Sequence, residues 1–131
     1  MKSGKLQIRV YYEDTDCGNV VYYANYLRYM ERARTELLRE HGIELVTYHE
    51  KGILFAVIEA DIKYRAPARY NDLLDLETRM SDISTVSLTF HTDICNCAKQ
   101  LLVTGDVRIA CVNTKGKASR IPVELLEKLK A

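Results

Sequence analysis

The sequence predicts an α+β fold in which one antiparallel sheet wraps around one long helix. Apolar and polar residues alternate over several short segments, which is typical of half-buried strands. A single long segment before the C-terminal region instead has its apolar residues at the three- and four-residue spacing of a helix. Short turns separate the later strands, which favours antiparallel pairing.

The first strand is predicted over Leu6–Tyr12, and a polar turn over residues 13–19 follows it. The spacing then changes to that of a helix, whose apolar face is formed by Tyr26, Leu27, Met30, Ala33, Leu37 and Leu38. We expect this helix to run from about Val21 to His41. Gly42 is expected to end it, because glycine readily adopts the left-handed conformation that follows many helices.

Four further strands are predicted in meander spacing, over Leu54–Tyr64 and residues 74–80, 86–94 and 101–111. Pro67 should interrupt strand pairing after the first of them, because proline donates no ladder hydrogen bond. A short last helix is predicted over Val123–Leu129, with Pro122 in its first turn. The sheet would still leave an edge strand exposed, so we expect a homodimer that joins two sheets edge to edge.

Length and composition restrict the class of protein. A chain of 131 residues predicts one domain over residues 1–131. Lys and Arg number 19 against 18 Asp and Glu, which argues against a general nucleic-acid binder. We expect no membrane span and no signal peptide, since apolar runs of the required length are missing. The four cysteines are then expected to be reduced, in a cytoplasmic protein.

The turn Asp14-Thr15-Asp16 is the first candidate for chemistry, because it lies just before the predicted helix. Unpaired N–H groups at a helix start can stabilise a developing oxyanion, and a nearby carboxylate can act as base or nucleophile. This pair suits hydrolysis of an acyl group. Taken on spacing alone, the aspartates most simply cap a turn and a helix. A Mg²⁺ site is the weakest alternative, since no phosphate-binding loop or further acidic cluster accompanies the pair.

Other reactive side chains have simpler interpretations. Cys17 adjoins Asp16, but a cysteine nucleophile needs a nearby histidine, and His41 is expected at the far end of the helix. His91, Asp93, Cys95 and Cys97 would share one face of a strand, where a zinc site is conceivable. Ligands along one straight strand lie too far apart for that, so a polar outer sheet face is the better interpretation.

Tyrosine is unusually abundant, with nine residues and no tryptophan. Six of the nine lie close to the acidic turn in sequence: Tyr11, Tyr12, Tyr22, Tyr23, Tyr26 and Tyr29. They can pack in the core or an interface, or they can form the wall of an acyl or aromatic pocket.

The residues from Val10 to Glu36, read as VYYEDTDCGNVVYYANYLRYMERARTE, closely resemble a known family. They are similar to the hotdog-fold acyl-CoA thioesterases of the 4-hydroxybenzoyl-CoA thioesterase group, nearest the bacterial branch associated with the Tol–Pal envelope system. A second block, Tyr64–Asp72 (YRAPARYND), resembles the same branch. The resemblance extends over nearly the whole chain in order and length.

This resemblance implies a five-stranded antiparallel sheet wrapped around one long central helix. It implies that Asp16 is the catalytic carboxylate and that the backbone N–H of Tyr23 polarises the thioester carbonyl, while Asp14 supports the turn. Pro67 and Asp72 fit a structural turn of the family. Neither metal nor redox cofactor is expected, because the CoA thiol is already a good leaving group.

The chain departs from the family pattern at two positions. Asn19 stands where relatives often have a second glycine, and Tyr23 stands where they often have a histidine. A backbone N–H survives a change of side chain, but the contribution of a histidine side chain would be absent. The same region lacks the histidine that a dehydratase of this fold generally uses.

The expected function is therefore hydrolysis of a short-chain or aromatic acyl-CoA, or of an acyl-carrier-protein thioester, by Asp16 acting as base or nucleophile. The alternative is a non-catalytic protein of the same fold that binds acyl-CoA or a protein partner. A homodimer or a dimer-of-dimers tetramer is expected, with the acyl pocket at the dimer interface. Arg65 and Arg69 are candidates for binding CoA phosphates.

Overall fold

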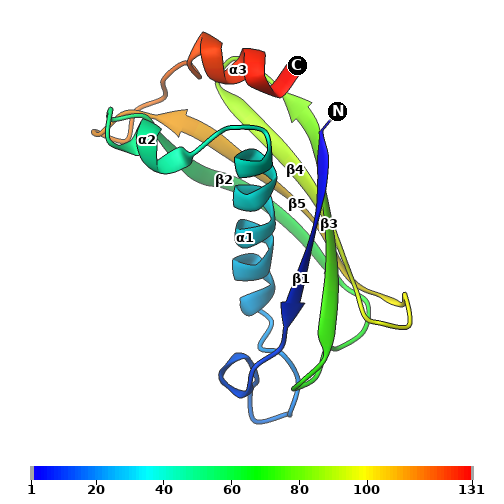
Figure 1. Cartoon of the computed structure of the whole chain (residues 1–131). Coiled ribbons are helices and arrows are strands. Elements are labelled where there is room, and N and C mark those ends of the chain that lie inside the picture. The colour runs from blue at the N-terminus through cyan, green and yellow to red at the C-terminus, as the bar shows by residue number, and fades with distance from the viewer. Residues whose placement is uncertain (1, 131) are drawn as a thin grey trace.

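The computed structural model describes residues 2–130 and has an α+β architecture, as predicted. One sheet lies behind a single long helix (Figure 1). Its strands are β1 (Ser3–Arg9), β2 (Leu54–Tyr64), β3 (Leu73–Ile83), β4 (Ser87–Cys95) and β5 (Leu101–Val112). The helices are α1 (Asn25–Glu40), α2 (Leu45–His49) and α3 (Val123–Lys130), with a short 3₁₀ turn η1 over Tyr12–Asp14.

All strand pairs are antiparallel, and the order across the sheet is β1-β3-β4-β5-β2. The predicted meander is correct for β3, β4 and β5 but wrong for β2, which crosses to the far edge and, within residues 2–130, pairs only with β5. The connection over residues 65–72 makes this possible. Its first N–H, that of Arg65, donates to the Leu102 carbonyl at 2.7 Å, which fastens the end of β2 to β5.

Both ends of the first strand and the start of the helix differ from prediction. β1 begins at Ser3, and Tyr12 lies in η1 instead of the strand. Helix α1 begins at Asn25, four residues later than expected. The residues just before it do not join the helix, because their N–H groups bond to other segments. The Val21 N–H donates to the Ala68 carbonyl at 2.9 Å, and the Tyr22 N–H donates to the Asp14 carbonyl at 2.8 Å.

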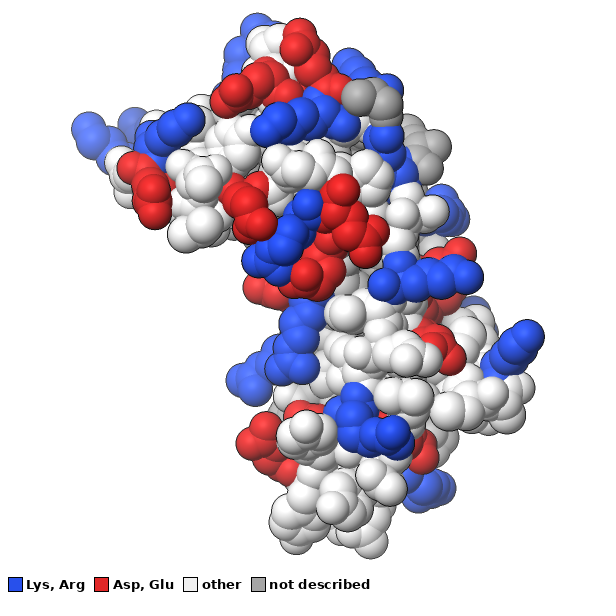
Figure 2. All heavy atoms as spheres, in the orientation of Figure 1, with Lys and Arg blue, Asp and Glu red and all other residues white. Residues whose placement is uncertain are grey.

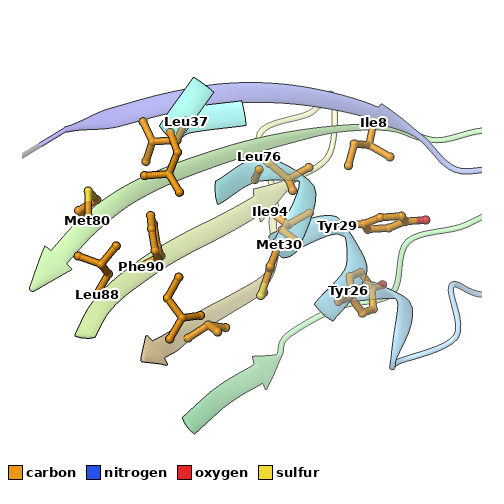
Figure 3. Packing of buried hydrophobic residues seen from close by; sticks show 14 of the residues in the cluster. Ile8, Tyr26, Tyr29, Met30, Leu37, Leu76, Met80, Leu88, Phe90 and Ile94 are labelled. Atoms are coloured by element: carbon orange, nitrogen blue, oxygen red, sulfur yellow. The ribbon is translucent and has the colours of Figure 1, made fainter. Parts of the chain in front are cut away.

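Helix α1 buries the predicted face against the sheet. Tyr26, Met30, Ala33, Leu37 and Leu38 are buried, while Leu27 is 40 % exposed and does not widen that face as expected. Figure 3 shows Met30 between the helix and the apolar side chains of the sheet. Gly105 of β5 permits this close approach, because a Cβ there would lie 2.7 Å from the Met30 methyl carbon.

The sheet is unequally covered. The inward residues of β3, β4 and β5 are buried in one core, whereas β2 has mostly exposed residues on both faces. Val57 and Ile58 of β2 are 54 % and 55 % exposed. The expected apolar face of β2 is therefore open in the isolated chain, since α1 packs on β1, β3 and β4 instead.

Helices α2 and α3 lie near the C-terminal end of α1 (Figure 1). Helix α2 was not predicted; only Tyr48 of its five residues is buried. Helix α3 is confirmed, and it ends within one residue of the predicted position. The Pro122 carbonyl accepts hydrogen bonds from N–H groups of its first turn. Figure 2 shows positive and negative side chains intermingled over the α1 side of the molecule. Among residues 2–130, no helix has both the length and the apolar content that crossing a membrane requires.

Candidate active site

The acidic turn folds back on itself as a small hairpin before α1. Thr15 and Val21 form an antiparallel bridge, and the Asp16 N–H donates to the Val20 carbonyl at 2.9 Å. Asn19 closes the hairpin with a φ of 63°, a left-handed conformation that asparagine tolerates better than most residues. The hairpin therefore brings Asp16 back beside the residues that begin the helix.

The Asp16 carboxylate is held by its own loop. Its Oδ1 accepts a hydrogen bond from the Gly18 N–H at 2.8 Å, and the residue is exposed. A carboxylate that bonds the backbone two residues ahead is a common turn device, and here it fixes the side chain without burying it. Gly18 packs closely, since a Cβ there would lie 3.2 Å from the same oxygen.

Asp14 ties the turn to the helix. Its Oδ2 accepts the Tyr11 N–H at 2.9 Å. Its carbonyl accepts the Tyr22 N–H at 2.8 Å and the Asn25 side-chain amide at 2.9 Å. The Asp14 side chain therefore stabilises the turn, and the Asp14 carbonyl holds the residues at the start of the helix.

The Tyr23 N–H lies at the start of α1 and is not used in folding. Within residues 2–130, no atom accepts a hydrogen bond from it. The helix also lacks a side-chain cap at Ala24. Unpaired N–H groups at a helix start carry a partial positive charge and bind anionic oxygens.

The Asp16 carboxylate influences one neighbouring tyrosine, Tyr22. The pKa of the Tyr22 hydroxyl is raised, chiefly by the neighbouring Tyr23 hydroxyl and in smaller part by the negative charge of Asp16. The Tyr22 and Tyr23 rings are in contact, with centroids 4.9 Å apart. Asp16 and Tyr23, predicted as partners, are thus brought to the same end of α1.

The tyrosines divide into two groups. Tyr26 and Tyr29 are buried, with their ring centroids 6.0 Å apart, and belong to the core. Tyr11, Tyr12, Tyr22 and Tyr23 are 45–77 % exposed around the turn. Within the exposed group, Tyr22 and Tyr23 supply aromatic surface at the start of α1, as a pocket wall would require.

Two of the three histidines lie at the opposite end of α1 from Cys17. His41 bonds the Leu37 carbonyl at the C-terminal end of α1, at 2.8 Å, and His49 ends α2 beyond it. A 16-residue helix is about 24 Å long, so both are remote from Cys17. His91 lies on the sheet, 2.8 Å from an Asp106 oxygen and 3.0 Å from an Asp93 oxygen.

The strand residues considered for zinc do not form a site. Cys97 lies in the turn after β4 instead of on the strand. Among residues 2–130, no group of three or more His, Cys, Asp or Glu side chains is arranged to hold a metal ion.

Sequence reasoning missed the residues that support Asp16 and Tyr23. A glycine two positions after an aspartate signals a turn of this kind, so Gly18 could have been found. Asn25 and Tyr64 carried no such signal, because their contacts depend on the tertiary fold. A surface hollow of about 550 Å³ lies along β1, and one of about 540 Å³ lies between β1, α1 and the acidic turn, where Asp14 lines it; neither is lined by Asp16 or Tyr23.

Comparisons with known proteins show the family to which the chain belongs. The family model of the thioesterase-like superfamily matches residues 10–129. The acyl-CoA thioester hydrolase YbgC of Escherichia coli O6:H1 is 38 % identical over 124 residues, which cover 94 % of this chain and 92 % of that protein. A probable thioesterase from Bartonella henselae is 35 % identical with a TM-score of 0.85, covering 92 % of this chain and 99 % of that one.

The structure of a 4-hydroxybenzoyl-CoA thioesterase with 4-hydroxybenzoyl-CoA has a TM-score of 0.88, and the match covers 98 % of this chain and 99 % of that one. At 21 % identity, this similarity shows the fold alone. The hotdog fold and the resemblance stated from the sequence are thereby confirmed. The chain belongs to the thioesterase-like superfamily and is a thioester hydrolase of the hotdog fold.

Proposed function

We propose that the chain hydrolyses acyl-CoA thioesters with Asp16 as the catalytic carboxylate and the Tyr23 N–H as the oxyanion donor. The observation that carries this proposal is the hairpin of residues 15–21, which returns Asp16 to the open N-terminal end of α1. The related YbgC proteins, named as acyl-CoA thioester hydrolases, support acyl-CoA as the substrate class.

The Tyr23 N–H would act on the thioester carbonyl. Negative charge develops on the carbonyl oxygen as the carbon is attacked, so a fixed N–H stabilises the transition state more than the bound substrate. The partial positive charge of the helix start acts in the same direction. Because no described atom accepts this N–H, the donor is available without breaking a bond of the fold.

Asp16 would supply the attack in one of two ways. As a nucleophile, its carboxylate oxygen bonds to the acyl carbon, the CoA thiolate leaves, and water then hydrolyses the mixed anhydride. As a general base, it takes a proton from a water that attacks the same carbon. The bond from Gly18 to Oδ1 leaves Oδ2 free for either step.

The exposed tyrosines favour a short-chain or aromatic acyl group. Tyr22 and Tyr23 form an aromatic surface at the helix start, where the acyl carbon would lie. Arg65 and Arg69 are exposed in the connection after β2 and are available to pair with CoA phosphates. An acyl-carrier-protein thioester presents the same carbonyl and stays a second substrate of this proposal.

The proposal includes a homodimer, or a tetramer built from two dimers, acting in the cytoplasm. Strand β2 supports the dimer, because its outer edge is unpaired within residues 2–130 and Val57 and Ile58 are exposed on it. Pairing two such edges would remove an aggregation-prone surface and complete a pocket between subunits.

A thiol-release assay over short-chain, long-chain and aromatic acyl-CoAs tests this function. Wild type is compared with Asp16→Asn, which retains an oxygen to accept the Gly18 N–H but loses the charge. Asp16→Ala removes both. We expect wild-type turnover, and a loss of roughly 10²–10⁴-fold in both variants, because a positioned base contributes about that factor.

Unchanged turnover in both variants would contradict the role of Asp16. No wild-type turnover on any thioester, together with CoA binding, would instead support a non-catalytic binding protein. Single turnover in H₂¹⁸O tests for the anhydride, because only water that attacks the Asp16 carbonyl of that intermediate would leave ¹⁸O in Asp16.

A further inference from the structure

The connection between β2 and β3, residues 65–72, lies directly against the Asp16 hairpin. The Val21 N–H donates to the Ala68 carbonyl at 2.9 Å, and Val20 forms an isolated bridge with Arg69. The Ala68 N–H in turn donates to the Tyr26 hydroxyl of α1 at 3.2 Å. The connection over residues 65–72 therefore contacts both the Asp16 hairpin and the start of α1.

Tyr64, the last residue of β2, immediately precedes this connection and contacts Tyr23, whose N–H is the proposed oxyanion donor. Its hydroxyl donates a hydrogen bond to the Tyr23 carbonyl at 3.2 Å. Its ring meets the Tyr23 ring edge-on, with centroids 6.3 Å apart at 85°, and lies 5.7 Å from the Tyr26 ring. The two tyrosines are 41 residues apart in the sequence.

Other hydrogen bonds hold the two peptides before the Tyr23 Cα, the second of which contains the Tyr23 N–H. The Tyr22 N–H donates to Asp14, and the Tyr22 carbonyl accepts from the Asn25 N–H at 2.8 Å. Within residues 2–130, the Tyr64 hydroxyl is the sole donor to the Tyr23 carbonyl, which belongs to the following peptide. With both flanking peptides held, the direction of the Tyr23 N–H is defined.

The hydroxyl stays a donor under assay conditions. Burial and the neighbouring Tyr23 raise the pKa of Tyr64 above that of a free tyrosine, so it remains protonated at neutral pH. Its ring contacts on two sides also restrict its rotation.

We infer that Tyr64 is a positioning residue, which aims the Tyr23 N–H at the thioester carbonyl through its hydrogen bond to the Tyr23 carbonyl. This inference rests on the proposed function. Removing the bond would leave substrate binding intact and lower the stabilisation of the transition state, because orientation matters most where charge develops.

The test compares Tyr64→Phe, which removes only the hydroxyl, with Tyr70→Phe as a matched control. Tyr70 is 59 % exposed, its ring packs on Tyr12, and its hydroxyl makes no hydrogen bond in the described chain. We expect Tyr64→Phe to lower kcat about three- to tenfold with KM and Tm unchanged, the size of one modest hydrogen bond. The control should match wild type.

A second measurement does not depend on turnover. The Tyr23 carbonyl and the Ala24 N–H share one peptide, so Tyr64→Phe should shift the Ala24 amide resonance and speed its hydrogen exchange. Amides at the C-terminal end of α1 should not change. A merely structural tyrosine would instead alter exchange across the whole sheet and lower Tm.

Three results would overturn the inference: a kcat equal to wild type, a rise in KM with kcat unchanged, or a kcat loss that only follows a lower Tm. Wild-type turnover that Asp16→Asn abolishes and Tyr64→Phe leaves intact would overturn this inference alone. A wild-type chain with no thioester turnover would overturn the proposed function, and this inference with it.

Discussion

The two ends of α1 are built in opposite ways. At the C-terminal end the Gly42 N–H donates to the Arg39 carbonyl and the Ile43 N–H to the Leu38 carbonyl, both at 3.0 Å. The Lys128 ammonium then donates to the Gly42 carbonyl at 3.2 Å. At the N-terminal end, no described residue provides a side-chain cap or accepts the Tyr23 N–H.

Burial follows the same division. Leu38 and Ile43 at the C-terminal end are each 1 % exposed, whereas Tyr23 at the N-terminal end is 62 % exposed. A helix end that lacks partners costs stability, so an open end is retained where its N–H groups serve another purpose. The closed end holds the fold, and the open end leaves the Tyr23 N–H available for the proposed bond to a substrate oxygen.

The largest expected effect comes from the charge at the open end. Asp16→Asn should reduce thiol release roughly 10²–10⁴-fold, because it removes the proposed base or nucleophile. It should leave the free energy of unfolding within about 0.5 kcal/mol, as for other exposed positions. Denaturant unfolding and kinetics on one sample check both values, and a large loss of stability would contradict the division of roles.

The next effect concerns the position of that carboxylate. Gly18→Ala would place a methyl group 3.2 Å from Asp16 Oδ1 and displace it. We expect activity to fall roughly ten- to a hundredfold, because small errors in position are costly in catalysis. Steady-state kinetics measures this. Wild-type activity in Gly18→Ala would show that the Gly18 contact does not set the position of Asp16.

The matched change at the closed end should act on stability alone. Gly42 has a φ of 77°, a left-handed conformation that strains any residue with a Cβ, and the added Cβ would meet nothing within 4 Å. Gly42→Ala should therefore lower the free energy of unfolding by about 1 kcal/mol. Its kcat at 25 °C should equal that of wild type. A reduced kcat would contradict the claim that the closed end contributes to stability alone.

The smallest effect concerns a buried hydroxyl beside the open end. Tyr29 is 1 % exposed, and its hydroxyl has no hydrogen-bond partner among the described atoms. Tyr29→Phe should raise the free energy of unfolding by up to about 1 kcal/mol, since an unpaired buried hydroxyl is costly. Denaturant titration checks this, and a destabilised variant would show that the hydroxyl is paired in solution.

The same residue predicts a pH dependence. Burial, and then the Asp14 carboxylate, raise the pKa of Tyr29 above its ordinary 10.0. A raised folded-state pKa means that the stability contribution is complete below pH 10 and falls as pH rises above it. Unfolding measured from pH 8 to 11 should show a shallower alkaline decline in Tyr29→Phe than in wild type. Parallel curves would exclude Tyr29 as a cause.

Local patterns in the sequence identified the elements but not all of their neighbours. The span of β2 was correct because alternation is a local property, yet its place at the far edge was missed because alternation does not specify a pairing partner. The start of α1 was placed four residues early, since Val21 and Tyr22 are held by Ala68 and Asp14 across the fold.

The candidate site shows the same limit. Spacing alone left Asp16 as a plain turn residue, and only the family resemblance suggested its role with Tyr23. Tyr64 could not be connected to Tyr23 from the sequence, because 41 residues and a change of sheet edge separate them. Such contacts are set by the tertiary arrangement of β2, the 65–72 connection and α1.

The central claim is that the open end of α1 polarises the substrate carbonyl. The most direct measurement is the ¹³C resonance of a carbonyl-labelled thioester bound to Asp16→Asn, in which turnover is too slow to consume it. A downfield shift on binding, reduced in Asp16→Asn/Tyr64→Phe, is the predicted result, because hydrogen bonding to the oxygen withdraws electron density from the carbon. A bound thioester with the resonance of the free compound would contradict the account.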